Sequence, residues 1–218
     1  MKMKRKICLI TAVCLAFCFI GGRACAASGF DDVGENDWFS RGVEYVTTNG
    51  LVPGVTDTVF EPATAIDRTM VITALHKYSE MKGCDVSVGL DTNILSYDDA
   101  FDIREGAHAA FQWACGSGLI PDEGATSLGA NEIMSREEMV ILLYDYAVLY
   151  GINPTAGEST NILSYTDVFG IAQDQGYSAF QWACGAGIIA GTSASTIDPA
   201  GRMTRAQLAT VLMNLSAQ

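Results

Sequence analysis

A short sequence pattern occurs three times along the chain with nearly constant spacing. Each copy has an aromatic residue with Asp two positions later, then Gly before an apolar residue, then Arg directly after a helix-capping residue. The copies cover residues 30–68, 97–136 and 165–205, and 18 residues separate Gly from Arg in every copy. Self-similarity at a fixed period means that one supersecondary unit is used several times, so we expect a repeat fold.

The first 26 residues have the composition of a secretory signal peptide. Four basic side chains among the first six residues precede an apolar run over 7–20, and small residues close the segment at Ala24-Cys25-Ala26. An apolar run of 14 residues is shorter than the ~20 that cross a bilayer, which disfavours a transmembrane anchor. A lipoprotein with Cys25 as its lipidated residue is the other alternative, but the residues before Cys25 fit that processing poorly. We therefore predict secretion and no membrane span in the mature chain.

The charge of the mature chain disfavours nucleic acid and anionic membranes as partners. Removal of residues 1–26 takes five of the thirteen basic side chains and no acidic one, which leaves 8 basic against 25 acidic side chains, a net charge of −17. A strongly acidic surface repels phosphate polymers and keeps an exported protein soluble.

Cysteine and histidine usage gives little support to a metal site. Cys115 and Cys184 occupy the same place in near-identical segments of the second and third repeats, so an inter-repeat disulfide is one interpretation for an exported protein. The other interpretation is two small residues packed at helix ends. Only Cys84, His76 and His108 remain outside the signal region, without metal-ligand spacing. We predict neither a metal nor a cofactor.

Each repeat reads as two helices joined by a turn-rich loop. In the first helix, apolar residues recur at helical spacing and end at a Gly, which is typical of a helix C-terminus. The second helix follows a capping box, a hydroxyl with Glu or Gln three residues later, at Ser135 with Glu138 and at Thr204 with Gln207. Asp67 is the corresponding cap in the first repeat. One apolar stripe follows each cap, so the sequence predicts an all-α, mostly helical fold.

One pair of helices cannot bury its apolar side alone, so we expect the three helix-loop-helix repeats to pack as a pseudo-threefold single module. Two stretches without helical periodicity, rich in Gly, Asn, Ser and Thr, are typical of linkers. The expected organisation is a signal peptide over 1–26, repeats over 27–80, 97–150 and 165–218, and linkers over 81–96 and 151–164.

The repeats resemble the S-layer homology family. Its unit opens with an aromatic-x-Asp-Val, passes through Gly-Leu or Gly-Ile, and closes with a Thr-Arg-Ala-Glu-like helix start, which is Thr204-Arg205-Ala206-Gln207 in the third repeat. The resemblance covers the mature chain apart from the linkers and implies a three-lobed helical module. It also implies a noncatalytic anchor that binds secondary polysaccharide of the bacterial cell wall, often pyruvylated, and holds exported proteins at the cell surface.

The arginines Arg68, Arg136 and Arg205 each follow a helix cap directly. A helix N-terminus has unpaired N–H groups and a partial positive charge that attract carboxylate or phosphate. A guanidinium binds a carboxylate at two points, so three copies in register favour a ligand role over solvated first-turn side chains. Because Asp67 and Glu137 place carboxylates beside two of the arginines, we rank the site at Arg205 first, that at Arg136 second and that at Arg68 last.

Aromatic and acidic side chains complete the predicted binding site. Trp113 and Trp182 lie off the apolar stripe, where they either stack on a sugar ring or fill contacts between repeats. Trp38 has no aromatic counterpart and is interpreted as packing, and for the aspartates a turn acceptor is favoured over catalysis or calcium binding. The predicted polysaccharide-binding residues are Arg205, Thr204, Gln207, Arg136, Ser135, Glu138, Arg68, Trp113, Trp182, Asp167, Asp99, Asp32 and Gly191.

Three further functions stay open at this point. A surface adaptor or assembly factor that binds another envelope protein is the main alternative, because little chain remains outside the repeats for a cargo domain. Direct binding to peptidoglycan is a variant of the polysaccharide hypothesis. An enzyme acting on wall sugars would need a pair of carboxylates, and nothing in the sequence marks one. We therefore predict no enzyme activity and a location at the bacterial cell wall or surface.

Overall fold

The computed structural model describes residues 29–89, 91–120, 126–153 and 155–218. Helices form the regular structure in these residues, without any strand, which confirms the predicted all-α class. None of the described helices is long and apolar enough to cross a membrane. The signal peptide predicted over 1–26 lies outside the described residues. The helices are α1 (Ser40–Thr48), α2 (Arg68–Met81), α3 (His108–Gly116), α4 (Arg136–Tyr150), α5 (Gly176–Gly185) and α6 (Arg205–Leu215), with 3₁₀ turns η1 (Ile94–Ser96), η2 (Ala100–Asp102) and η3 (Val168–Gly170).

The predicted helix starts are confirmed. Ser135 with Glu138 forms a reciprocal capping box at α4, and Thr204 with Gln207 does so at α6. Asp67 caps α2 by accepting a hydrogen bond from Met70 N. Each cap satisfies a backbone donor that has no partner inside the helix, which is why the second helix of every repeat begins directly after this residue.

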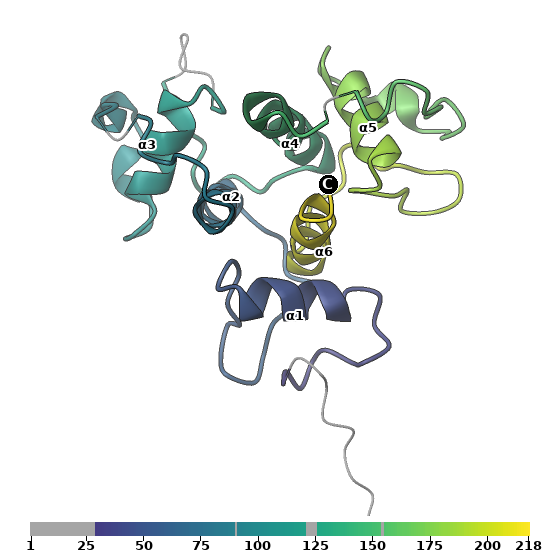
Figure 1. Cartoon of the computed structure of the whole chain (residues 1–218), viewed down its shortest axis with the longest axis horizontal. Coiled ribbons are helices and arrows are strands. Elements are labelled where there is room, and N and C mark those ends of the chain that lie inside the picture. The colour runs from purple at the N-terminus through teal and green to yellow at the C-terminus, as the bar shows by residue number, and fades with distance from the viewer. Residues whose placement is uncertain (1–28, 90, 121–125, 154) are drawn as a thin grey trace, which may run out of the picture.

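The helices that pack side by side come from different repeats. Helix α2 packs against α3 and α4 packs against α5, whereas α6 packs against α1 at the other end of the chain. Figure 1 shows three lobes, with α2, α4 and α6 near the centre and α1, α3 and α5 outside them. The last helix of the chain therefore completes the lobe that the first helix begins. The predicted apolar stripes of α2, α4 and α6 are buried in this arrangement.

A closed ring of three backbone hydrogen bonds lies between the lobes. Ile66 N donates to Met203 O at 2.9 Å, Met203 N to Met134 O at 2.9 Å, and Met134 N to Ile66 O at 3.0 Å. These residues lie just before the caps of α2, α6 and α4, and all three side chains are buried. The ring ties the three repeats together at equivalent positions, so each repeat depends on both others for these contacts.

The stretches expected to be linkers also pack in the lobes. Gly157 lies so close to α5 that a Cβ atom on Gly185 would be 2.4 Å from Gly157 Cα. The same contact occurs in the second repeat, where a Cβ atom on Gly116 of α3 would be 2.2 Å from Gly89 Cα. A side chain at either helix position would push the two backbones apart. Gly89 and Gly157 therefore bring one point of each expected linker against a helix of a lobe, and the repeat boundaries themselves stay a prediction.

The glycine contact predicts a marked difference between two substitutions. Gly185→Ala should lower the free energy of unfolding by about 1–3 kcal/mol, because the added methyl overpacks against backbone that cannot move aside. Gly170→Ala is the control, since a Cβ atom at Gly170 has no heavy atom within 4 Å. Thermal and urea unfolding of both variants provides the measurement. Equal stability of the two variants would contradict the close approach.

Candidate functional site

The three repeat aspartates fix the loop that leads to each second helix. The carboxylate of Asp167 accepts hydrogen bonds from Ile197 N at 2.9 Å and Asp198 N at 2.8 Å. Asp32 accepts from the equivalent nitrogens of the first repeat, those of Phe60 and Glu61. Asp99 accepts from the equivalent Leu128 N and from Ala130 N, which lies one position beyond the second equivalent residue. These carboxylates therefore act as loop acceptors, the interpretation that the sequence favoured over catalysis or calcium binding.

The helix starts do not offer open N–H groups to an anion. Arg205 N donates to Thr64 O and Ala206 N donates to Pro62 O, both at 3.0 Å. The third donor, Gln207 N, is satisfied by the cap. The first two N–H groups of α2 and α4 are likewise bound by carbonyls of the following repeat, and the third by the cap residue. The anion-site argument made from the sequence is corrected here, because neighbouring loops occupy these donors.

Two of the repeat arginines also bind neighbouring loops. Arg136 donates from Nε to Ile197 O at 2.8 Å and from Nη2 to Ala190 O at 2.9 Å. Arg205 makes the equivalent bonds to the loop of the first repeat, at 2.6 Å and 2.7 Å. Both side chains are buried, and desolvation lowers the pKa of each guanidinium below its usual value. The two arginines thus fasten loops to helix starts rather than project into solvent.

Arg68 has different partners. Its Nη2 lies 3.3 Å from Glu138 Oε1 and 3.9 Å from Glu132 Oε2. Its Nε is buried without a hydrogen-bond partner among the described residues. By sequence equivalence with Arg136 and Arg205, the carbonyl for Nη2 would fall at position 121, which lies outside the described residues, whereas the carbonyl for Nε would be that of Leu128, to which Nε is not bonded. An acidic ligand at Arg68 would compete with two carboxylates.

The buried tryptophans are not available to a sugar. Trp113 is 0% exposed and Trp182 is 2% exposed. Their indole nitrogens donate to Tyr150 Oη and Asn153 O, both at 3.1 Å. Of the two interpretations left open by the sequence, burial therefore excludes stacking on a sugar and leaves interior packing.

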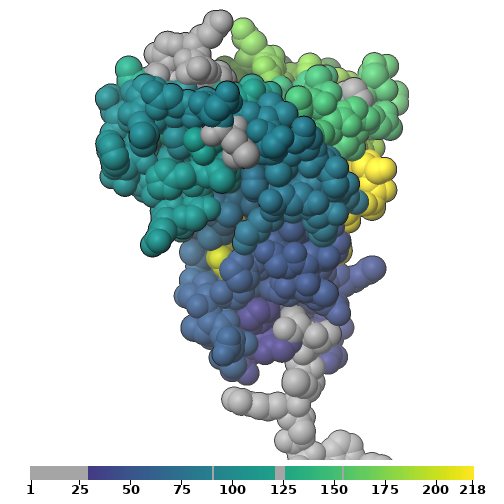
Figure 2. Space-filling model, turned by 60° about the vertical axis from the view of Figure 1, so that its left-hand side comes forward, coloured from purple at the N-terminus to yellow at the C-terminus, as the bar shows by residue number. Residues whose placement is uncertain are grey.

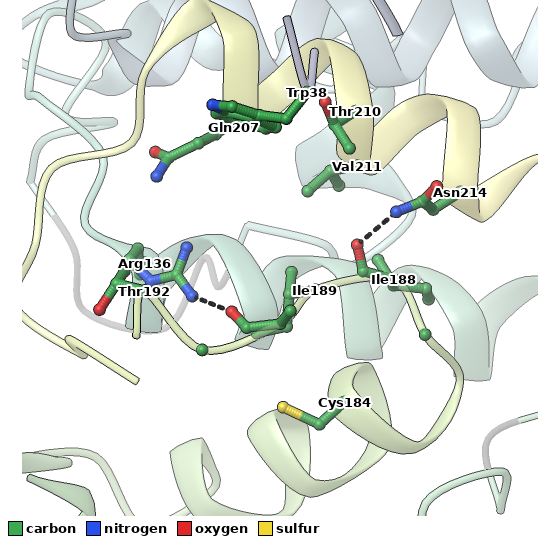
Figure 3. Close-up of a pocket in the computed structure, with 13 residues that line it drawn as sticks. Trp38, Arg136, Cys184, Ile188, Ile189, Thr192, Gln207, Thr210, Val211 and Asn214 are labelled. Carbon is green, nitrogen blue, oxygen red and sulfur yellow. Dashed lines mark hydrogen bonds between the residues drawn. The ribbon is translucent and has the colours of Figure 1, made fainter. Parts of the chain in front are cut away.

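The larger of two related grooves lies between α6 and the loop 187–192 of the third repeat. It encloses about 640 Å³ and reaches Arg136 of the second repeat and Trp38 of the first. Figure 3 shows Trp38, Gln207 and Thr210 along one side of the cavity and Arg136 along the other, with one guanidinium nitrogen pointing into it. Trp38 is 65% exposed, so its interpretation as packing was wrong. We call this cavity the first groove.

The second groove is the equivalent cavity beside the second helix and the loop of the first repeat. It encloses about 400 Å³ between α2 and the loop of the first repeat. In Figure 2 the surface is hollowed between the α1 lobe and the lobe of α2 and α3, and a small patch of the C-terminal part of the chain is visible inside. Five lining positions outside the loops are shared by the two grooves. The second groove and the first groove have, in turn, Met70 and Gln207, Thr73 and Thr210, Lys77 and Asn214, Gly106 and Trp38, and Arg205 and Arg136.

The interface between α4 and the start of α5 is the third one equivalent to the two grooves. Here the side chains at the groove positions are bonded to one another. Asp145 stands at the position of Asn214 and Lys77, and Gln175 at that of Trp38 and Gly106. Gln175 Nε2 donates to both carboxylate oxygens of Asp145, at 2.8 Å and 3.0 Å. Together with the ion pair between Arg68 and Glu138, these contacts cross the interface. Among the described residues of this interface, the carboxylates of Asp145 and Glu138 are thus bonded within the protein.

The remaining predicted site residues have structural positions. Gly191 lines the first groove, and a Cβ atom there would lie 2.6 Å from the Tyr165 ring. Thr204 and Ser135 are engaged as helix caps. Cys115 and Cys184 are thiols, so the inter-repeat disulfide is not formed. Within the described residues, no group of His, Cys, Asp and Glu could hold a metal ion.

Lys77, Asn214 and Trp38 were not among the predicted site residues. A signal for Trp38 was present in the sequence: it is the tryptophan with no aromatic at the equivalent positions, Gly106 and Gln175. A residue that occurs in only one repeat is not required by the fold that all three repeats share. An exposed apolar residue of this kind therefore indicates a binding site.

Comparison with known families agrees with these features. The family model described as the S-layer homology domain matches residues 29–68 and 164–209. The two matches include the start of α6 and the loops that line both grooves, whereas the second repeat is related to them by the equivalent contacts described above. None of the curated proteins compared with the chain matches it.

The arginine contacts predict that Arg205 stabilises the fold. Arg205→Ala should lower the free energy of unfolding by about 2–4 kcal/mol, because it removes the donors from the buried carbonyl of Phe60 and from the partly buried bond to Pro53 O. Arg205→Lys should recover only part of this loss, since an ammonium cannot reproduce the two-point geometry. Urea unfolding measures the effect. Arg202→Ala, at an exposed arginine nearby, is the control, and a loss no larger than in that control would contradict the structural role.

The loop aspartates predict an acid-dependent stability. Partial burial tends to raise the pKa of Asp167, but hydrogen bonds from Ile197 and Asp198 and the nearby Arg136 outweigh it, so this pKa lies below 3.8. A lowered folded-state pKa gives stability that is present at neutral pH and lost as the pH falls through that value. Asp167→Asn should therefore be less stable than wild type at pH 7, by about 1–2 kcal/mol. The gap should narrow below about pH 4.

Thermal unfolding across pH 2–7 measures this gap. Asp57→Asn, on an exposed turn of the first repeat, provides the control for removal of one carboxylate. A gap that stays constant with pH would show that the carboxylate charge of Asp167 does not contribute.

Proposed function

The chain carries S-layer homology domains, a family of cell-surface anchoring modules, and from this premise we propose that it docks on secondary polysaccharide of the bacterial cell wall. It acts as an exported, noncatalytic binding module. The observation that carries the proposal is the pair of equivalent grooves, each lined by residues of all three repeats. An intact module is therefore required before either groove exists.

The first groove has the chemistry that a sugar requires. The exposed indole of Trp38 supplies an apolar face for the C–H side of a sugar ring. Gln207, Thr210 and Asn214 supply amide and hydroxyl groups for sugar hydroxyls. Arg136 Nη1 has no hydrogen-bond partner among the described residues, so it can donate to a ligand. This combination of an apolar platform and a few polar groups is typical of a ligand pocket.

The polymer we propose is acidic and carries a pyruvyl substituent. Support comes from the second groove, where Lys77, Arg104 and Arg205 lie in the lining of a protein whose net charge is −12. Cations gathered in a groove of an acidic protein give a local attraction for carboxylate. Arg205 contributes to this groove while also fastening the loop, so its two roles are compatible.

A second candidate function, as an adaptor for an envelope protein, is favoured by one observation. Phe101 of η2 is 84% exposed and Phe169 of η3 is 89% exposed, at equivalent positions of two repeats. Leu95 and Leu163, also at equivalent positions, are exposed nearby in sequence. Exposed apolar residues of this kind are typical of protein contacts.

The proposed function predicts that Trp38 contributes directly to wall binding. Trp38→Ala should weaken sedimentation of the protein with purified native walls about tenfold, through loss of one stacked aromatic contact. Walls stripped of secondary polysaccharide should retain little wild-type protein. Phe169→Ala is the matched control, an exposed aromatic outside both grooves.

The same experiment separates the two candidates. Equal binding to native and stripped walls would contradict the polysaccharide proposal. Loss of binding after protease treatment of the walls, together with loss in the Phe101→Ser, Phe169→Ser double variant, would favour the protein adaptor instead.

A further inference from the structure

The two grooves are equivalent in backbone but differ in side-chain chemistry. At one shared position on the central helix the first groove has Asn214 and the second has Lys77. At the shared position before the outer helix the first groove has Trp38 and the second has Gly106. A site duplicated by the repeat has thus been given an aromatic face in one copy and an ammonium group in the other.

The second groove carries most of the positive charge. Lys77 is exposed, and its Nζ donates to Gly50 O at 3.3 Å, which leaves further donors of the ammonium for a ligand. Arg104 is half exposed and is paired with Asp67 through one nitrogen. Glu105 is the one carboxylate in this lining. Lys77, Arg104 and Arg205 outnumber Glu105 in the lining and Asp67 behind Arg104, so this groove is attractive for a carboxylate in spite of the acidic surface around it.

The first groove is less charged and more apolar. Arg136 is the one charged residue in its lining, and two of its nitrogens are already bonded to loop carbonyls. Its remaining wall includes Trp38, Ile189 and Val211. Figure 3 shows the cavity open between the Trp38 side and the Ile189 side, which is the space that a sugar ring would fill.

We propose that the two grooves divide recognition of the wall polymer, and this inference rests on the proposed function. The first groove binds an uncharged sugar ring against Trp38. The second groove binds the acidic substituent through Lys77 and Arg104. The third interface binds neither, because Asp145 and Glu138 occupy the positions of the groove residues and are bonded to Gln175 and Arg68.

The two grooves can be tested separately, the first by the fluorescence of Trp38 and the second by substitution of Lys77. Trp38 is the exposed tryptophan, while Trp113 and Trp182 are buried, so acrylamide quenching of tryptophan fluorescence reports occupancy of the first groove. Lys77→Asn gives the second groove the residue of the first, and Asn214→Lys makes the reciprocal change. Both variants alter partly exposed positions, and thermal unfolding verifies that they fold.

The probes are purified secondary wall polysaccharide and the same polymer after mild acid has hydrolysed its pyruvate ketals. Wild type should bind the acidic polymer about tenfold more tightly than the neutral one. Lys77→Asn should remove this preference while leaving affinity for the neutral polymer within about twofold of wild type. Both polymers should protect Trp38 from acrylamide to the same final extent. Asn214→Lys should increase the preference for the acidic polymer.

Separate outcomes contradict the two proposals. If neither polymer binds wild type, the proposed function itself fails. If both bind but Lys77→Asn weakens them equally, or if only the acidic polymer protects Trp38, the division between grooves is overturned while wall binding stands.

Discussion

The structure depends on one kind of contact, in which the second helix of each repeat is capped by the loop of another repeat. Arg205 N and Ala206 N donate to carbonyls of the first repeat, and the Arg205 side chain binds two more. The same contacts join the second repeat to the third through Arg136. A single repeat would lose several of these bonds. Each buried donor or carbonyl left unpaired would cost about 1–3 kcal/mol of folding free energy. The repeats are therefore structurally interdependent.

This interdependence determines where a ligand can bind. Because a lobe combines the second helix of one repeat with the first helix of another, the spaces between lobes are lined by all three repeats. The elements that repeat in register, such as Asp167 and Arg136, hold loops and helices in place. The residues that break the register, Trp38 and Lys77, give each groove its own chemistry. Arg136 and Arg205 line the grooves as well as holding the loops, so the residues that differ between the grooves are those that the repeated fold does not require.

The sequence predicted what is local and failed where contacts are long-range. Capping boxes and apolar stripes involve residues three or four apart, so Ser135, Thr204 and the helices that follow them could be predicted. The pairing of α6 with α1 could not, because nothing near Arg205 indicates that Phe60 O lies against it. The prediction of an open anion site failed for this reason: it treated the helix start as facing solvent. For Trp113 the sequence left stacking on a sugar and packing between repeats open, because periodicity gives no information on the neighbouring repeat, whose His76 contacts the indole.

The charge of the module imposes a final constraint on its ligand. An acidic protein repels an acidic polymer at long range, but at physiological ionic strength charges farther apart than about 8 Å are largely screened. The second groove is lined by Lys77, Arg104 and Arg205 against the one carboxylate of Glu105, so a carboxylate in the groove meets a net positive lining. At lower salt the acidic surface acts over a longer range and opposes approach. Binding that strengthens with moderate salt is therefore compatible with a cationic groove, because screening removes the distant repulsion before it weakens the close contacts.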